Sequence, residues 1–161
     1  MKKRFSGIIV LIGLLAMVAG PAWGADDVIK IGVVGPRTGG AAATGKAFEE
    51  GIQLAGDHVN ASGGVLDKKL EVVFEDTAGA PDKAASGFER LVTRDNVVMV
   101  LGESHSSAAL AEIEVANRLK IPFIVVEAWA DPITAKNYKY VFRAGPSNRS
   151  EEHTSELQSL L

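Results

Sequence analysis

The segment Val28-Ile29-Lys30-Ile31-Gly32-Val33-Val34-Gly35 decides the fold class. Its residues are mostly apolar and β-branched, and the run ends at a glycine. A short apolar run without polar alternation is typical of a strand that is buried on both faces of a sheet. Such strands occur in parallel sheets covered by helices, so this segment predicts an α/β fold.

Strand and helix signals alternate along the rest of the chain. Further strands are expected at 70–74, 97–101, 121–126 and 138–142. Between them, apolar residues recur at helical spacing and predict the inner faces of three helices: Phe48, Ile52, Leu54, Ala55 and Val59; Ala84, Ala85, Phe88, Leu91 and Val92; and Leu110, Ile113, Val115, Ala116 and Leu119. Right-handed crossovers then give a doubly wound, Rossmann-like parallel sheet.

The strand ends indicate where a ligand would bind. In an open parallel sheet, ligands bind beyond the carboxyl ends of the strands, where the strand order reverses. The candidate loops are therefore 35–45, 75–81, 102–107 and 127–131. The loop at 62–68 lies at the opposite edge and is expected to be structural.

Residues 1–24 have the pattern of a secretory signal peptide. A basic start at 2–4 precedes an apolar run over 8–19, and small residues at 22–24 suit a cleavage site. The alternative, an uncleaved anchor, is disfavoured because about 20 apolar residues are needed to span a bilayer. The chain has no cysteine, which excludes disulfides and a lipid-bearing cysteine at the cleavage point. We therefore expect a periplasmic protein without a membrane span after cleavage.

We interpret the C-terminal end of the chain as a segment that is foreign to the protein. Residues 149–159 read Arg-Ser-Glu-Glu-His-Thr-Ser-Glu-Leu-Gln-Ser, which resembles the translation of a common sequencing adapter. The alternative is a polar native helix. We expect residues 149–161 to be non-native, which leaves a lobe over 25–148.

The composition disfavours several function classes. The formal net charge is −3 and basic residues do not cluster, which argues against a nucleic-acid partner. The sequence shows neither a metal-ligand cluster nor a nucleophile–base–orienter set. No metal, cofactor or catalytic residue is therefore predicted, and we do not expect an enzyme.

The first candidate loop nearly matches a nucleotide-binding motif. Residues 40–47 read Gly-Ala-Ala-Ala-Thr-Gly-Lys-Ala, but the phosphate-binding pattern needs Ser or Thr where Ala47 stands, because that hydroxyl ligates Mg²⁺. ATP is also absent outside the cytoplasm. We interpret the segment as a loop in which Thr44 either caps a helix or contacts a ligand.

The third candidate loop contains Ser104, His105 and Ser106 at the start of a helix. Unpaired amides and the helix dipole favour an anion there, so these residues could hold a carboxylate. The equally weighted alternative is that Ser106 or Ser107 only caps the helix. His105 has no acid nearby in our interpretation, so a catalytic triad is not predicted.

The fourth candidate loop places Glu127, Ala128 and Trp129 after a strand. Glu127 could accept a bond from a ligand ammonium or hydroxyl, and Trp129 could form an apolar or cation–π wall. In the alternative, Glu127 is exposed, Trp129 lies in the core and Asp131 caps a short helix that begins at Pro132.

Several motifs together resemble one family, the branched-chain amino acid (Leu/Ile/Val)-binding proteins of ABC transporters. The resemblance covers residues 28–148 and rests on Val33-Val34-Gly35-Pro36 with Thr38-Gly39, Asn60-Ala61-Ser62-Gly63-Gly64-Val65, Glu75-Asp76-Thr77, Pro81-Asp82-Lys83-Ala84, Gly102 with Ser106-Ser107, and Tyr140-Val141-Phe142-Arg143. It implies a type I periplasmic-binding fold, in which two lobes close around a small ligand.

The resemblance also implies roles for single residues. The loop with Ser104, His105 and Ser106 would bind a ligand carboxylate, with Ser106 as the hydroxyl donor. The loop with Glu127, Ala128 and Trp129 would contact the ammonium end, and Thr44 would stand at a position that is often aromatic. Since Thr44, Glu127 and Trp129 depart from the typical leucine binder, branched-chain specificity is not expected.

The function that the resemblance implies is capture of an amino acid or similar small carboxylate for delivery to an inner-membrane ABC permease. The alternative is a periplasmic sensory module of the same fold. We expect the chain to be an N-terminal fragment that lacks the second lobe and therefore binds ligand weakly or not at all by itself.

Overall fold

The computed structural model describes residues 28–149. The expected signal peptide at 1–24 and positions 150–161 of the expected non-native tail lie outside these residues. The described elements are, in chain order, β1 (Val28–Gly35), α2 (Ala42–Ala61), β2 (Lys69–Asp76), α3 (Pro81–Thr93), β3 (Met99–Gly102), α4 (Ser106–Leu119), β4 (Phe123–Val125), α5 (Pro132–Ala135) and β5 (Val141–Arg143). The alternation of strands and helices predicted from the sequence is confirmed.

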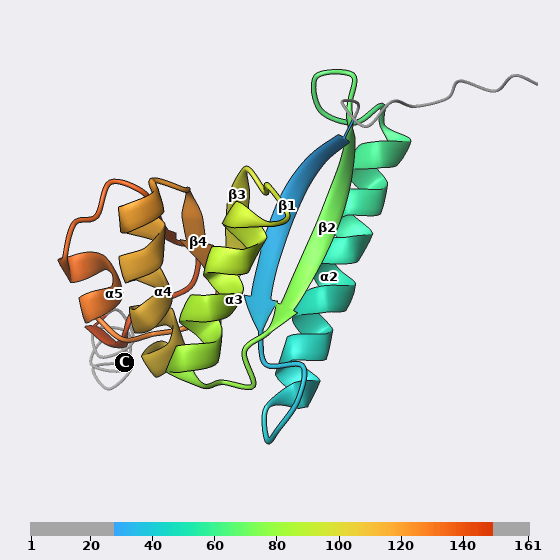
Figure 1. Ribbon diagram of the computed structural model, residues 1–161. Coiled ribbons are helices and arrows are strands. Elements are labelled where there is room, and N and C mark those ends of the chain that lie inside the picture. The colour runs from blue at the N-terminus through green and yellow to red at the C-terminus, as the bar shows by residue number, and fades with distance from the viewer. Residues whose placement is uncertain (1–27, 150–161) are drawn as a thin grey trace, which may run out of the picture.

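The strands form one five-stranded sheet in the order β2-β1-β3-β4-β5, and every neighbouring pair is parallel. The chain moves outward from β1 to β2, then returns to the other side of β1 for β3. This reversal makes α2 and α3 lie on opposite faces, as Figure 1 shows. The fold is therefore the predicted doubly wound α/β sheet, with its switch point between β1 and β3.

The face that carries α3 and α4 holds the core. One row of paired positions on this face crosses the sheet through Gly32, Val100, Phe123 and Val141. Phe123 is fully buried and packs edge-to-face on Phe88 of α3, with 5.1 Å between ring centroids. The inner face predicted for α3 is largely confirmed, because Ala84, Phe88 and Leu91 are fully buried.

The opposite face is covered by α2 over β1 and β2 (Figure 1). The inner face predicted for this helix was partly wrong: Leu54 is 57% exposed and Ala55 is exposed, whereas Gly45 and Gly56 are buried. A Cβ on Gly45 would come within 2.1 Å of the Pro36 carbonyl oxygen. The glycine thus lets the first turn of α2 pack directly on the loop after β1. This packing explains why a glycine stands at position 45, where the sequence resembles a nucleotide-binding motif.

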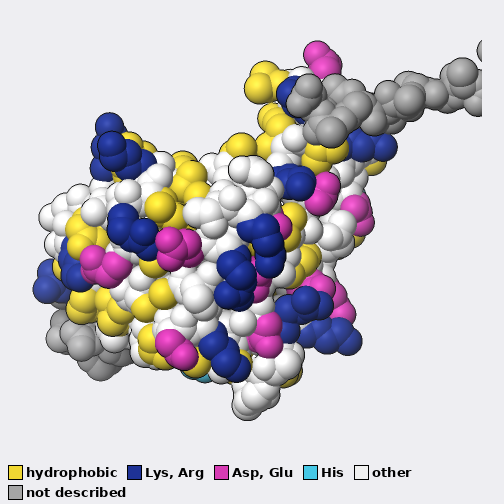
Figure 2. Space-filling model, in the orientation of Figure 1, with side chains coloured by type: hydrophobic (Ala, Val, Ile, Leu, Met, Phe, Trp, Pro, Cys, Tyr) yellow, Lys and Arg dark blue, Asp and Glu magenta, His cyan; other side chains and the backbone are white. Residues whose placement is uncertain are grey.

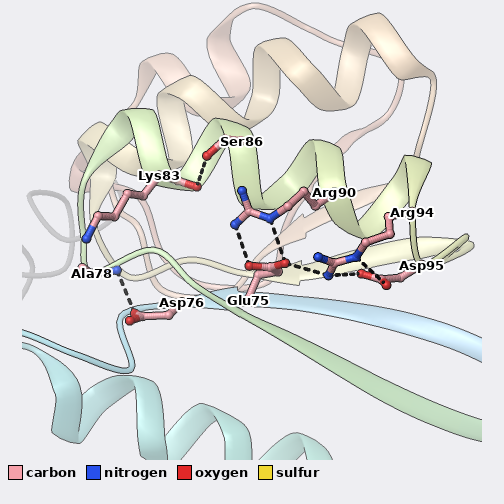
Figure 3. Close-up of polar contacts among 8 residues, drawn as sticks. All are labelled: Glu75, Asp76, Ala78, Lys83, Ser86, Arg90, Arg94 and Asp95. Carbon is pink, nitrogen blue, oxygen red and sulfur yellow. Dashed lines mark hydrogen bonds and ion pairs between the residues drawn. The ribbon is translucent and has the colours of Figure 1, made fainter.

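The edge between β2 and α3 is held by an ion-pair cluster (Figure 3). The Glu75 carboxylate accepts hydrogen bonds from Arg90 at 2.7 and 3.0 Å and from Arg94 at 3.0 Å. The hydrogen bond from Arg90 is the main cause of a lowered pKa at Glu75. Arg94 also pairs with Asp95, so the cluster fixes the end of α3 to the sheet edge.

Candidate functional site

A pocket of about 420 Å³ lies at the carboxyl ends of β1, β3 and β4, at the switch point of the sheet. Its walls come from loops that are far apart in the sequence. The lining residues are Ala41, Thr44, Ser104, His105, Ser106, Glu127, Trp129 and Asn148. The structure therefore brings three of the four predicted ligand loops together around one space, whereas no residue of the loop at 75–81 lines it.

Gly102 helps the loops after β1 and β3 to meet at this point. It has a φ of +136°, and a Cβ there would lie 2.0 Å from the Val34 carbonyl oxygen of β1. Only glycine tolerates both the backbone conformation and this close approach. The end of β3 can thus lie against β1 where the pocket begins.

Every predicted ligand residue except Ala128 lines the pocket. Ala128 is 1% exposed and belongs to the hydrophobic core below the loop, so its side chain is not at the pocket surface. Trp129 is 44% exposed, which makes the alternative of a core tryptophan wrong. Ala41 and Asn148 were not predicted, because neither has a side chain that marks a site by its chemistry.

Ser106 does not cap its own helix. Residue His105 occupies the N-cap position of α4, and no side chain there makes a capping hydrogen bond. Instead, the Ser106 Oγ accepts a hydrogen bond from the Ala130 amide at 3.2 Å. Because a hydroxyl has a single proton, which this bond does not use, Ser106 can still donate to a ligand.

Thr44 also lines the pocket without capping a helix. The helix α2 begins at Ala42, with Ala41 at the N-cap position, so Thr44 lies within the first turn. The capping alternative for Thr44 is therefore wrong. Thr44 and Ser106 thus line the same pocket from two different helices, α2 and α4.

The main-chain amides of the loop at 102–107 have other partners than the sequence predicted. The amides of Ser104 and His105 donate to Oε1 of Glu103, at 2.9 and 3.1 Å, and the Glu103 side chain is fully buried. These amides are thus already paired and are not open to a ligand carboxylate. The amide of Ser106, at the first position of α4, lacks an acceptor within the helix and remains the better donor.

Glu103 also corrects the prediction that His105 has no acid nearby. Its Oε1 lies 3.6 Å from Nδ1 of His105, and the Ser104 hydroxyl lies 3.1 Å from the same nitrogen. A nucleophilic relay needs the hydroxyl on one ring nitrogen and the acid on the other. Since both groups face Nδ1, the geometry is not that of a catalytic triad.

A second carboxylate fixes the loop after β1. Asp76, the last residue of β2, accepts hydrogen bonds from the amides of Arg37, Thr38 and Ala78 and from the Thr38 hydroxyl, at 2.6–3.2 Å. Burial opposes the shift, but these hydrogen bonds lower the pKa of Asp76 below its ordinary value. Asp76 therefore stays ionised at neutral pH and holds the loop that leads to Thr44.

Arg143 of β5 holds the loop that carries Glu127 and Trp129. Its guanidinium donates to the carbonyl oxygens of Trp129 and Ala130, and also to that of Pro146. The Asn148 amide donates to the Trp129 carbonyl at 3.1 Å. These hydrogen bonds hold the main chain of the loop that carries Glu127 and Trp129. The side chains of Glu127 and Trp129 take no part in them and line the pocket.

A larger hollow of about 780 Å³ runs along α2, away from the strand ends. Its charged side chains pair with one another, as in Arg37 with Glu49 and Lys46 with Glu50. It is therefore a solvent-exposed helix face whose charged groups pair with one another. Within residues 28–149, no three potential metal-ligating side chains cluster, and no helix has the length and apolar character to cross a membrane.

Known proteins with similar sequences and structures belong to one family. Residues 28–156 match the family described as periplasmic binding protein. A curated relative, Leu/Ile/Val-binding protein homolog 7 of Brucella suis, is 30% identical over 141 residues, which are 88% of this chain and 35% of the relative.

Two solved structures share the fold. The branched-chain amino acid transporter substrate binding protein of Streptococcus pneumoniae, in complex with isoleucine, has a TM-score of 0.71 and 37% identity, and the match covers 74% of this chain and 34% of that one. A solute binding protein of an ABC transporter from Rhodopseudomonas palustris, in complex with 3,4-dihydroxy benzoic acid, has a TM-score of 0.67 and 34% identity, over 75% and 32%.

The chain spans about a third of the length of these relatives. The TM-scores of 0.71 and 0.67 show that the matched parts share one fold. With the match over residues 28–156, this shows that the chain belongs to the periplasmic binding protein family.

Proposed function

We propose that this chain is a ligand-binding lobe of the substrate-binding component of an ABC transporter, and that it takes an amino acid or a related small carboxylate. The observation that carries the proposal is the pocket at the switch point. It gathers Ser106, Glu127 and Trp129 from two loops around about 420 Å³ of space. Pockets at this place in doubly wound sheets bind small ligands.

The chemistry of the pocket fits a ligand with two different ends. Ser106 offers a hydroxyl proton and a helix N-terminal amide, which suit a carboxylate. Glu127 is exposed to the pocket and offers acceptors, which suit an ammonium or a hydroxyl group. Isoleucine and 3,4-dihydroxybenzoate both have a carboxylate and hydrogen-bond donors elsewhere, so the pocket accommodates the chemistry of either class.

The pocket is also lined by an aromatic side chain, that of Trp129. Trp129 is 44% exposed and lines the pocket, and its backbone carbonyl accepts hydrogen bonds from Arg143 and from the Asn148 main-chain amide. An indole in this position gives an apolar surface for an aliphatic or aromatic ligand body, with little entropy lost on binding. We propose that Trp129 supplies the apolar contact with the ligand that the polar side chain of Thr44 does not provide.

The proposed protein works outside the cytoplasm. The signal-peptide pattern at 1–24 supports export, and the family supports an extracytoplasmic receptor that hands its ligand to a membrane permease. We propose a second lobe that closes over the pocket, because the relatives are about three times as long as the matched part.

The test is a thermal-shift screen of the full-length protein that carries this lobe, with the standard amino acids and hydroxylated benzoates. A ligand that binds only the folded state stabilises it by about 2.7 kcal/mol at about a hundred times its Kd. We expect a rise in Tm with at least one carboxylate. The matched control is the amide of the same compound, which should give a much smaller rise.

Two results would contradict the proposal. One is that no compound in either class raises Tm. The other is that the amide raises Tm as much as the acid, which would show that the carboxylate is not recognised.

A further inference from the structure

A fully buried acidic residue lies directly behind the pocket. Glu103 follows β3, and its side chain has no exposure to solvent. Buried carboxylates are rare unless hydrogen bonds compensate for the lost hydration. The partners of Glu103 therefore indicate why an acid is placed there.

The side chain of Glu103 joins two loops. Its Oε1 accepts the Ser104 and His105 amides of the loop after β3. Its Oε2 accepts the hydroxyl of Thr77, at 2.6 Å, from the loop after β2. Thr77 is also fully buried, so this bond is protected from water.

The main chain of Glu103 joins a third loop. Its carbonyl oxygen accepts the Glu127 amide at 3.3 Å and the Ala128 amide at 3.0 Å. These two amides begin the loop that carries Glu127 and Trp129 into the pocket. One residue thus links the ends of β2, β3 and β4.

We propose that Glu103 is a positioning residue for the ligand site, which locks these three loops together so that Ser106, Glu127 and Trp129 face one pocket. The proposal rests on the proposed function, since it concerns the affinity of that same site. Glu103 does not line the pocket, so it acts through the residues that it holds.

The side-chain requirements of this role are specific. A glutamine keeps the length of the side chain, accepts the two amides through its oxygen and can donate to the Thr77 hydroxyl oxygen. An alanine leaves both amides and the Thr77 hydroxyl without their acceptor. The role therefore predicts that glutamine restores what alanine removes.

Glu112 of α4 offers a matched control. It is also a fully buried acid, and it lies close enough for the charge of Glu103 to raise its pKa. Its carboxyl oxygens have no hydrogen-bond partner among the described residues, so it holds no loop. Substitution of Glu112 thus alters a buried acid in the same region and leaves the proposed link intact.

The experiment compares Glu103→Ala, Glu103→Gln, Thr77→Val and Glu112→Gln in the full-length protein. Affinities for L-isoleucine and 3,4-dihydroxybenzoate are measured by calorimetry, and hydrogen exchange of the Ser104 and His105 amides is measured by NMR without ligand. For Glu103→Ala we expect about tenfold or greater loss of affinity and faster exchange of both amides. Glu103→Gln and Glu112→Gln should stay within about threefold of the parent.

Thr77→Val should weaken binding by about threefold to tenfold, and it decides the question if Glu103→Ala does not fold. The proposal is overturned if folded Glu103→Ala keeps the parent affinity and amide protection, or if Glu112→Gln weakens binding as strongly. It is also overturned if Thr77→Val changes neither affinity nor exchange. If neither probe binds the parent protein, the proposed function fails for these ligands, while the exchange rates still test the link made by Glu103.

Discussion

In the proposed site, the hydroxyl of Ser106 is the group that would contact a ligand carboxylate most directly. It accepts a bond from the Ala130 amide and has its proton left for a ligand. We expect Ser106→Ala to lower the affinity of the full-length protein by about 1.5–3 kcal/mol, the value of a hydrogen bond to a charged group. Calorimetry measures this loss directly.

Ser107→Ala is the matched control for that substitution. Ser107 is the next residue of α4, but it is exposed and does not line the pocket. Its removal should leave the Kd unchanged. Equal affinities for Ser106→Ala and the parent protein would show that Ser106 serves only its bond to Ala130.

Glu112 makes the stability of the fold depend on pH. Burial, and secondly the charge of Glu103, raise its pKa well above the ordinary glutamate value. The folded state therefore keeps a proton that the unfolded chain releases, and the free energy of unfolding falls as pH rises from the ordinary value toward the raised one. We expect Glu112→Gln to remove this fall and to stabilise the protein at neutral pH.

Denaturant unfolding of both proteins between pH 4 and pH 8 checks this expectation, since about pH 4.3 is the ordinary glutamate pKa. The difference between variant and parent should grow with pH. A constant difference, or a parent that becomes more stable relative to the variant as pH rises, would contradict a protonated Glu112.

Phe123 and Phe142, on the adjacent strands β4 and β5, should contribute very differently to stability. Phe123 is fully buried against Phe88, whereas Phe142 is 52% exposed on the opposite face of the sheet. Phe123→Ala should cost about 3–5 kcal/mol through lost burial and a cavity. Phe142→Ala should cost about 1 kcal/mol or less, because most of its surface stays in water.

Urea unfolding of the full-length variants measures the two costs. Similar losses for both substitutions would mean that the outer face of β5 is covered in the whole protein. Since this face of the sheet is covered by α2 only over β1 and β2, that result would locate a further packing surface at β5.

The strands and helices could be predicted because their signals are local. Runs such as 28–35 are apolar on both faces, and Pro81 begins α3 as its restricted backbone favours. The helix caps could not be predicted, because capping depends on backbone geometry that a serine does not dictate. The exposure of Leu54 was missed for a similar reason: α2 approaches the sheet through glycines, which carry no hydrophobic signal.

The pocket itself followed from topology, since strand ends that meet at a switch point bring their loops together. Glu103 was missed because an acid after a strand is usually solvated, and its burial requires partners from two other loops. The hydrogen bonds from the Ser104 and His105 amides to Glu103 were missed for the same reason, because they require Glu103 to be buried. Residues that line the pocket were thus easier to predict than the buried residue whose hydrogen bonds join their loops.

Among the described residues, the face of the molecule that carries α3 and α4 has no cluster of basic side chains. Figure 2 shows basic and acidic side chains interspersed over the face of α3 and α4, without a patch of one sign. Electrostatic footprints for nucleic acids need clustered basic residues. The polar and aromatic groups that converge do so at the strand ends, in the pocket with Ser106, Glu127 and Trp129.

A crystal structure of the full-length protein with a carboxylate from the thermal-shift screen tests the central claim most directly. We predict that the ligand lies at the carboxyl ends of β1, β3 and β4, with its carboxylate within hydrogen-bond distance of the Ser106 hydroxyl and its body against Trp129. A ligand bound elsewhere, for example in the hollow along α2, with the pocket at the switch point filled by solvent, would contradict the account.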